Sequence, residues 1–406
     1  MKSFFYKYKN EVLVFSIIFI LYLVISYVNF TKTTIFYNTN NTYDVLLDTD
    51  TGILFNWNTF AISQDNSKHI LFSAIVSILA YPIYNISLFL SKNGLNYNGC
   101  YGGGLIFLQI LVSAASITLI YNFMKTIKIN KITLNLLTIL ITFSFPQLFM
   151  SLNIERFIYT QFSLVFYIFL VLKLKNKDSY LLDIAAIPLF GMTITNIYLY
   201  FFNLIFQFKF NIKKISKHIL LFIFMLYICI IVTKSYNSFL NVSSVVQSDS
   251  QFILNISIIE KFKYIITRLL YPILYFPGYE LVNNSIRQNS NVNIIFLIIV
   301  LIIFLIAILG GITNIKDNNV KLLMSIIGIN IILHGIIGYN LLSANIMTIH
   351  FQFAVILLLA YFSINLKGNN ISIFNIFLCL VIITVIISNV IGFSDILKLG
   401  MSIYPK

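Results

Sequence analysis

Long uninterrupted apolar runs constrain this chain more than any other feature of its sequence. Residues 12–28 (VLVFSIIFILYLVISYV), 294–312 (IIFLIIVLIIFLIAILGGI) and 373–393 (IFNIFLCLVIITVIISNVIGF) each approach the roughly 20 residues that a helix needs to cross a bilayer core. In lipid, backbone N–H and C=O groups must be paired within their own segment, so such runs fold as helices. Hydrophobic residues make up 59% of the chain and charged residues only 10%, which excludes an ordinary soluble protein. We therefore expect an all-α, polytopic transmembrane fold.

Hydrophobic windows predict about 11–13 membrane segments, some of them broken or re-entrant. One expected segment, near 262–277, is shorter than the others. The others lie near 11–29, 70–90, 104–123, 132–150, 157–172, 180–206, 218–233, 293–313, 322–342, 351–366 and 371–392. No stretch has the composition of a soluble domain, so a single transmembrane domain over residues 1–406 is expected.

We divide this domain into three parts. Residues 1–233 contain a first outer loop at 31–68, and residues 293–406 contain the C-terminal helices. Between them, residues 234–292 are of mixed polarity and include Lys261, Lys263 and Arg268 among aromatic and aliphatic residues. This middle part is expected to form either an outer interfacial helix lying on the membrane or a short crossing.

The distribution of lysine predicts the orientation of the chain in the membrane. The net charge of +14 comes from lysines placed between apolar runs, which indicates membrane orientation and no nucleic-acid partner. Loops at 124–131, 173–177 and 209–217 carry several lysines each and are expected in the cytoplasm. The acid-rich loop 31–68 then emerges on the outer face.

This orientation conflicts with two simple crossings at 70–90 and 104–123, because these would carry the loop 124–131 to the outside. We expect one of these segments to break or re-enter, either near Pro82 or at the glycine run 99–104. Segment 180–206 has lysine loops on both sides and is expected to form two half-helices.

The acidic loop is the first candidate for chemistry. Asp44, Asp48, Asp50 and Asp65 lie within it, although the whole chain has only 13 acidic residues. Asp48 and Asp50 in LLDTDTG could converge on Mg²⁺, Mn²⁺ or Ca²⁺, or one of them could act as a general base. The alternative is a solvated loop whose acids only reflect topology. The single tryptophan, Trp57, is expected to be an interfacial anchor.

Two further polar positions are expected on the same outer face. Lys68 and His69 stand at the start of the second apolar run, and Glu155 and Arg156 separate two later runs. A cation and an imidazole beside a carboxylate loop are candidates for binding a phosphate. The alternatives are an ordinary interfacial histidine and a self-paired Glu–Arg couple at a helix end.

Arginine and histidine are rare enough in this chain to be informative. Its three arginines, Arg156, Arg268 and Arg287, all fall at expected outer positions, and arginine binds phosphate in a bidentate manner. His334 lies within an apolar run and His350 at the outer end of the next, where each is either functional or bonded to a neighbouring helix. The three cysteines are far apart and indicate no disulfide framework or zinc site.

Taken together, these residues resemble the GT-C superfamily of integral-membrane glycosyltransferases, and most closely a poorly characterised bacterial family within it. The resemblance covers roughly the first half of the chain, with weaker agreement at GYNLLSANIMTIHF. It rests on four stretches in order: LLDTDTG, KHILFSAIVSILAYP, LNIERFIYTQF and FGMTITN.

The resemblance implies transfer of a sugar from a polyprenyl-phosphate donor to a cell-envelope acceptor on the outer face of a bacterial plasma membrane. It implies that Asp48 or Asp50 is the catalytic base or a ligand of Mg²⁺ or Mn²⁺. Lys68, His69 and Arg156 would then steady the leaving phosphate, with Glu155 and His350 assisting in substrate binding.

Two other functions fit the sequence. A polymerase of lipid-linked saccharide repeat units would also use many helices and outer loops. A lipid or saccharide flippase would not be an enzyme, and such transporters usually show internal repeats. The glycosyltransferase hypothesis requires the aspartate loop, His69 and Glu155 to line one outer-face site.

Overall fold

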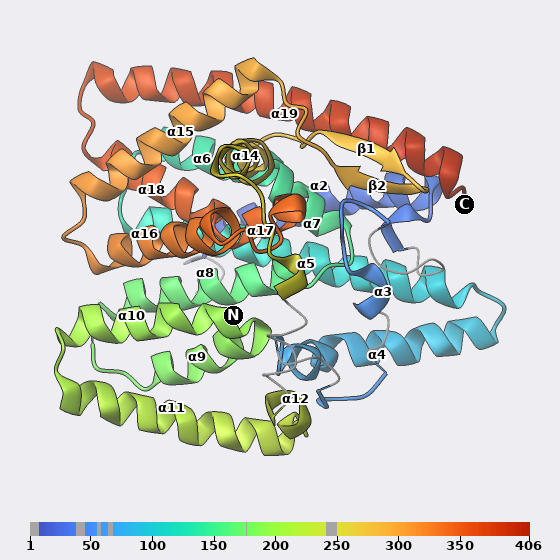
Figure 1. The fold of residues 1–406 in the computed structure, drawn as a ribbon, viewed down its shortest axis with the longest axis horizontal. Helices are drawn as coiled ribbons and strands as arrows, with labels where there is room; N and C mark the ends of the chain where they lie inside the picture. The colour runs from blue at the N-terminus through green and yellow to red at the C-terminus, as the bar shows by residue number, and fades with distance from the viewer. Residues whose placement is uncertain (1–7, 38–44, 55–57, 64–67, 176, 241–249) are drawn as a thin grey trace.

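The computed structural model describes residues 8–37, 45–54, 58–63, 68–175, 177–240 and 250–406. Within these residues, eight helices are long and apolar enough to cross a membrane, and two bent helix pairs bring the number to ten. Most helices run side by side along the longest axis of the molecule (Figure 1). The predicted all-α, multi-pass membrane fold is therefore confirmed. The expectations for Asp44, Trp57 and Asp65 lie outside the described residues.

The first half of the chain contains the helices that carry most of the predicted site residues. Its longer helices are α2 (Lys9–Lys32), α4 (Phe72–Lys92), α5 (Tyr97–Thr126), α6 (Lys131–Phe143), α7 (Phe145–Leu152), α8 (Phe157–Leu174), α9 (Leu181–Met192), α10 (Ile197–Phe208) and α11 (Ile212–Val232). Its short elements are the turns η1 (Ile35–Tyr37) and η2 (Ile194–Asn196) and the helices α3 (Thr51–Leu54) and α12 (Tyr236–Leu240).

The second half begins with irregular structure and ends in long helices. Its short elements are η3 (Ser250–Phe252), α14 (Ile258–Tyr264), the π-helix η4 (Ile265–Leu270), η5 (Tyr271–Ile273), β1 (Tyr279–Val282), β2 (Ser285–Gln288), the π-helix η6 (Ile331–Ile336), η7 (Leu341–Ser343), α17 (Ala344–Met347) and η8 (Thr348–His350). The longer helices are α15 (Ile294–Thr313), α16 (Asn318–Asn330), α18 (Gln352–Ile364) and α19 (Asn369–Ile403).

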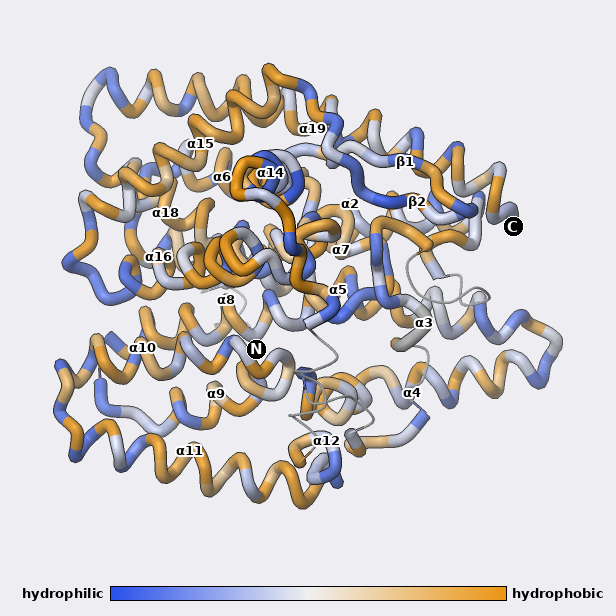
Figure 2. The backbone as a smooth tube through the Cα atoms, viewed as in Figure 1, coloured by the Kyte–Doolittle hydropathy of each residue, from blue (hydrophilic) through white to orange (hydrophobic). Residues whose placement is uncertain are grey.

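Lysine-bearing loops gather at one end of the bundle, as the sequence predicts. Lys125 at the end of α5 pairs with Glu11 at the start of α2 at 2.7 Å, and Lys173 donates to Thr126 at 3.2 Å. The turns between α8 and α9, α10 and α11, α15 and α16, and α18 and α19 lie at the same left edge of the view (Figure 1). Figure 2 shows these turns as hydrophilic ends of hydrophobic helices.

The predicted break in α4 or α5 is wrong. Both helices are continuous, α4 through Pro82 and α5 through the glycines at 102–104. These glycines allow close packing instead, since a Cβ at Gly104 would lie 2.2 Å from Ile83. Ile83 thus lies beside the first quarter of α5, while α5, about 45 Å long, continues to the lysine end.

The break expected in segment 180–206 is confirmed. Helix α9 ends at Met192, and α10 begins at Ile197. Leu71 donates its backbone N–H to the carbonyl of Gly191 at 3.1 Å, and Ile194 donates to the carbonyl of Lys68 at 3.0 Å. A Cβ at Gly191 would lie 2.6 Å from Leu71 Cβ, so this approach requires glycine. The residues at this break are therefore hydrogen-bonded to the residues that directly precede α4.

A second break, between α6 and α7, lies within the segment expected as a single helix at 132–150. The two helices meet at Ser144 with a bend of 51°. The carbonyls freed there accept hydrogen bonds from Tyr22 (to Thr142, 2.6 Å) and Asn389 (to Phe143, 2.7 Å). Distant helices thus satisfy buried backbone groups that lipid could not.

A small sheet holds the acidic loop. β1 and β2 pair antiparallel through a turn at Asn283 and Asn284, both with positive φ, as tight hairpins favour. Residues 45–47 extend this sheet on the side of β2, where Leu47 donates to the carbonyl of Ile286 at 2.7 Å and Ile286 donates to that of Val45 at 2.8 Å. The pairing fixes where Asp48 leaves the sheet.

Candidate functional site

The loop that carries Asp48 and Asp50 has an unusual backbone. Leu47 and Asp48 have φ of +50° and +64°, a left-handed conformation that few non-glycine residues adopt. Thr49 closes the turn by donating both its backbone N–H and its hydroxyl to the carbonyl of Leu46. Strained turns of this kind cluster at functional sites, where the surrounding structure must hold them.

Glu155 provides much of that support. Its Oε2 accepts the backbone N–H of Asp50 at 2.7 Å, and its Oε1 accepts the backbone N–H of Arg156 at 2.6 Å. Arg156 in turn donates from Nη2 to Oδ2 of Asp50 at 2.5 Å. The loop is therefore joined directly to the start of α8, and three predicted site residues form one cluster.

This cluster is largely shielded from solvent. Glu155 is fully buried, and Gln109 on α5 donates to its backbone carbonyl at 2.7 Å. Burial, reinforced by the nearby charge of Asp50, raises the pKa of Glu155 to about 8, although the charge of Arg156 opposes this. Because both carboxyl oxygens are engaged by the backbone, Glu155 positions the loop and presents no oxygen of its own to a ligand.

Asp48 has a different environment from Asp50. Burial raises the pKa of Asp48, while a hydrogen bond from Ser343 and the charges of Arg287 and Arg268 oppose this rise. No ion pair of Asp48 within 4.0 Å is found among the described residues, whereas Asp50 is paired with Arg156. The two aspartates thus differ in how free their oxygens are to accept a proton.

His69 lies close enough to Arg156 to feel its charge. It is buried, and its Nδ1 lies 2.6 Å from the carbonyl of Met192, so Nδ1 carries the proton and Nε2 the lone pair in the neutral ring. Burial, with a further contribution from the charge of Arg156, keeps the pKa of His69 well below its ordinary value. Thr193 bridges this ring and Thr160, at 3.5 Å and 3.2 Å.

Lys68 is held by aromatic rings. Its ammonium donates to the hydroxyl of Tyr339 at 3.0 Å and lies 5.2 Å and 5.7 Å from the ring centroids of Phe252 and Tyr339. The adjacent His334 bonds to the backbone carbonyl of Tyr339 at 2.9 Å. The lysine is therefore fixed beside His69 by a segment from the second half of the chain.

His350 closes the cluster from the side of η8. Its ring is buried and meets that of Phe157 edge-on, with centroids 5.0 Å apart. Among the described residues, its Nε2 has no hydrogen-bond partner, and the same is true of Nε of Arg156. Buried polar atoms are normally paired, so both positions are suited to a ligand or an ordered water.

Sequence reasoning missed the part played by residues 341–345. Ser343 bonds Asp48, and Asn345 donates its backbone N–H to Gln288 at 3.2 Å. Arg268 fixes this segment by donating to the carbonyl of Leu342 at 2.7 Å and to that of Gln288 at 3.1 Å. The weaker agreement at GYNLLSANIMTIHF includes these residues but predicts no role for them, because that role depends on a fold that brings η7 against the aspartate loop.

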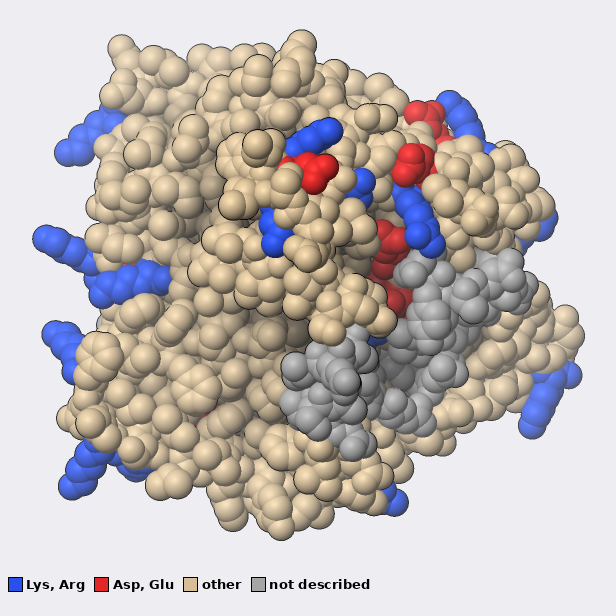
Figure 3. Space-filling model, viewed as in Figure 1, with Lys and Arg blue, Asp and Glu red and all other residues tan. Residues whose placement is uncertain are grey.

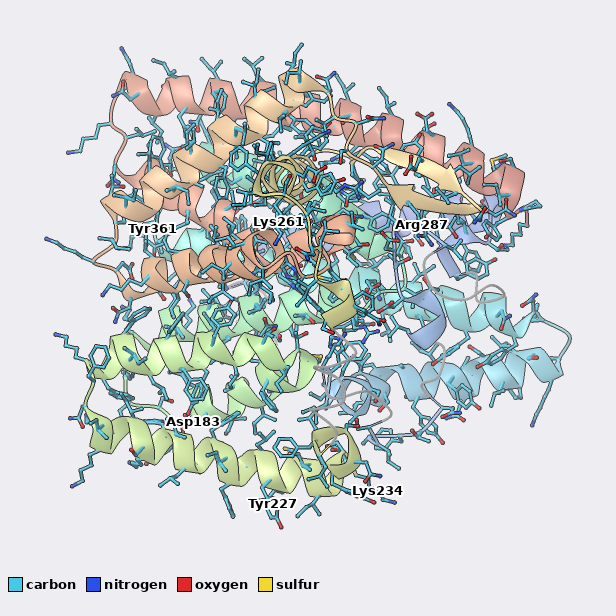
Figure 4. All side chains as sticks on the ribbon, in the orientation of Figure 1. Asp183, Tyr227, Lys234, Lys261, Arg287 and Tyr361 are labelled. Atoms are coloured by element: carbon cyan, nitrogen blue, oxygen red, sulfur yellow. The ribbon has the colours of Figure 1, made fainter. Side chains whose placement is uncertain are left out.

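Charged side chains gather near this site on one face of the molecule. Figure 3 shows acidic and basic side chains together around α14, β1 and β2, whereas the left edge carries cations. In Figure 4, Arg287 is labelled on β2 and Lys261 on α14.

Asp48 and Asp50 are the carboxylates that would hold the expected metal. Among the described residues, no group of three or more His, Cys, Asp or Glu side chains could hold an ion. Asp50 is engaged by Arg156, and two arginine charges act on Asp48. Mg²⁺ usually keeps several waters and is held by one or two carboxylates together with substrate phosphates, so a metal at Asp48 and Asp50 stays a prediction.

The comparisons with known proteins give no family for this chain. No protein-family model matches the sequence, and no curated protein matches it. Its function must therefore be argued from the site itself.

Proposed function

We propose that this protein is an integral-membrane glycosyltransferase of the GT-C type. It transfers a sugar from a polyprenyl-phosphate donor to a hydroxyl group of a cell-envelope acceptor, on the outer face of a bacterial plasma membrane. The observation that carries this proposal is the direct bonding of the Asp48–Asp50 loop to Glu155 and Arg156, beside His69 and away from the lysine loops.

Asp48 is the better candidate for the general base. A base needs a free oxygen and a pKa nearer to neutrality than that of an exposed aspartate. The pKa of Asp48 is raised, and its carboxylate forms no ion pair among the described residues. In Asp50, Oδ2 already accepts a hydrogen bond from the guanidinium of Arg156, so this oxygen is less free to take a proton from a substrate.

In the proposed reaction, the acceptor oxygen attacks the anomeric carbon of the donor while the bond from that carbon to the phosphate oxygen breaks. The acceptor proton passes to Asp48, and the phosphate leaves with the bonding electron pair on its lipid. Direct displacement inverts the anomeric configuration.

Two fixed cations match the charge that develops on the leaving phosphate. Arg156 has an Nε donor without a hydrogen-bond partner among the described residues, and Lys68 is held in place by two aromatic rings. Preorganised cations stabilise such a transition state because they need no rearrangement during the reaction. His69 has a different task, since a neutral ring with its lone pair on Nε2 can accept a hydrogen bond from a substrate hydroxyl but has no charge with which to bind phosphate.

The experiment that tests these roles measures transfer of radiolabelled sugar by purified wild-type protein, Asp48→Asn and Asp50→Asn. We expect Asp48→Asn to lose about 10²- to 10⁴-fold in rate, the usual contribution of a general base, and Asp50→Asn to lose less. Glu280→Gln, a change on the exposed strand β1, serves as the control. Equal transfer by all four proteins would remove the role assigned to the loop.

A further inference from the structure

A buried histidine that the proposed reaction does not use lies at the lysine end of the bundle. His218, in the second turn of α11, is buried between two aspartates. Its Nε2 lies 2.9 Å from Oδ1 of Asp178, in the turn between α8 and α9, and its Nδ1 lies 2.8 Å from Oδ2 of Asp183, in the first turn of α9. The ring therefore joins α11 both to α9, where Asp183 is labelled in Figure 4, and to the turn before it.

The two aspartates differ in their access to solvent. The side chain of Asp183 is fully buried, and Tyr200 on α10 donates to its Oδ1 at 2.8 Å. The side chain of Asp178 is 42% exposed, and the ammonium of Lys214 lies 3.8 Å from its Oδ2. His218 thus connects a carboxylate that meets water with one that does not.

The distances indicate how many protons the three side chains share. A neutral imidazole has one N–H and one lone pair, whereas both ring nitrogens of His218 lie at hydrogen-bond distance from a carboxyl oxygen. With a neutral ring between two carboxylates, one of these contacts would place a nitrogen lone pair against oxygen lone pairs. Nδ1 also lies 3.0 Å from Oδ1 of Asp183, as expected for an N–H shared by both oxygens of a carboxylate. An imidazolium that donates to both aspartates satisfies every contact.

The surroundings of the ring suit a cation. The ring of Phe208 stacks on that of His218 with centroids 5.1 Å apart, the ring of Tyr180 lies at 5.6 Å, and aromatic faces attract a cation within about 6 Å. The hydrogen bond from His218 holds the pKa of Asp178 below its ordinary value, so this carboxylate stays charged. The other described groups around the three side chains that carry or can carry a charge are Tyr167, Tyr200, Lys214 and Lys217. Lysine ammonium groups do not accept a proton, so the two aspartates supply the charge that holds it.

We propose that Asp178, His218 and Asp183 form a proton-binding site that holds the turn between α8 and α9 against α11 and responds to the pH at the lysine end. With the proton bound, the imidazolium donates from Nε2 to Asp178 and from Nδ1 to Asp183. When the pH rises, the Nε2 proton passes through Asp178 to water, and the ring keeps its Nδ1 proton and its bond to Asp183. The lone pair of Nε2 then faces the Asp178 carboxylate, which repels it, and the turn is released from α11. The sequence predicts that this end faces the cytoplasm, so the ligand is a cytoplasmic proton.

Nuclear magnetic resonance of the histidine rings tests the bound proton. Full-length protein with isotope-labelled histidine is placed in nanodiscs, and His218→Gln assigns the signals of this ring among the four histidines. In wild type, we expect N–H protons on both ring nitrogens of His218 at pH 6 and on Nδ1 alone at pH 9. A neutral ring at both pH values, which burial without a bound proton would give, would overturn the proposal, and so would a charged ring at both.

Hydrogen–deuterium exchange tests the hold on the turn and needs no change of His218. After correction for the direct effect of pH on amide exchange, peptides covering residues 177–184 should exchange about 3- to 10-fold faster at pH 9 than at pH 6, the effect of losing one hydrogen bond. Asp178→Asn should abolish this pH dependence, because a carboxamide can accept from a protonated Nε2 and can donate to its lone pair.

The matched control for this exchange measurement is Asp395→Asn. Its carboxyl is 41% exposed and pairs with Lys398 at 3.1 Å, much as Asp178 is half-exposed beside a lysine, and this variant should exchange as wild type does. Equal exchange of residues 177–184 at both pH values in wild type would overturn the proposal. The same pH dependence in Asp178→Asn as in wild type would also overturn it.

Discussion

Replacing Glu155 with glutamine should loosen the aspartate loop without unfolding the protein. The carboxyl of Glu155 accepts two backbone N–H groups, one from Asp50 and one from Arg156. A carboxamide keeps one acceptor oxygen but turns an NH₂ group towards the other N–H donor. One buried backbone N–H then loses its partner.

The size of the effect follows from that loss. Leaving a buried donor unpaired costs about 1–3 kcal/mol. If the loss falls on Asp50, the free energy of local opening drops by this amount, and its amide should exchange with solvent about 5- to 150-fold faster. The side-chain charge changes little at neutral pH, because the pKa of Glu155, about 8, already favours the protonated form.

Hydrogen–deuterium exchange measured by mass spectrometry in detergent or nanodiscs is the direct assay. The peptide that contains Asp50 should lose protection, while peptides from the middle of α5 should exchange as in wild type. Glu260→Gln, a change in an exposed carboxyl, is the matched control. Unchanged protection of both the Asp50 and the Arg156 amides in Glu155→Gln would refute the role given to Glu155.

Three further predictions concern pH and packing. The pKa of Glu155 is raised in the folded state, so the stabilisation that its protonated form provides is present below the ordinary value near 4.5 and is lost as pH rises through about 8. The wild-type protein should therefore unfold at a lower temperature at pH 9 than at pH 7. The difference in unfolding temperature should be smaller in Glu155→Gln. Removing the Arg287 charge in Arg287→Gln should raise the pKa of Asp48 further, so the acid limb of the sugar-transfer profile should move to higher pH, and an unmoved limb would contradict the assignment. In Gly191→Ala, the new Cβ would lie 2.6 Å from Leu71 Cβ at the α9–α10 break, which should destabilise the protein by about 1–3 kcal/mol and lower its unfolding temperature. Gly328 has open space around it, so Gly328→Ala should leave the unfolding temperature unchanged.

The sequence predicted the helices well because apolar runs leave the backbone few alternatives in lipid. It also predicted the break in segment 180–206, where lysine loops on both sides exclude a simple crossing. The break between α6 and α7 was missed, since the side chains that satisfy it, Tyr22 and Asn389, come from opposite ends of the chain. The predicted break in α4 or α5 was wrong because Gly102 to Gly104 serve packing rather than bending.

The candidate site was predicted in part for similar reasons. Rare acids and arginines at expected outer loops pointed to Asp50, Glu155 and Arg156, and the fold brings them together. The sequence could not show that both oxygens of Glu155 serve the backbone, nor that Ser343 would reach Asp48. Such roles depend on atomic contacts between segments that are distant in the chain.

We propose that the aspartate loop supplies the general base of a sugar-transfer site. The most direct measurement is transfer of radiolabelled sugar from a panel of polyprenyl-phosphate donors to cell-envelope acceptors, by purified wild type and by Asp48→Asn with unchanged folding. We predict that wild type uses at least one donor and forms one polyprenyl phosphate for each sugar transferred, while Asp48→Asn does neither at a comparable rate. Equal transfer by both proteins, or no transfer by wild type from any donor, would contradict the account.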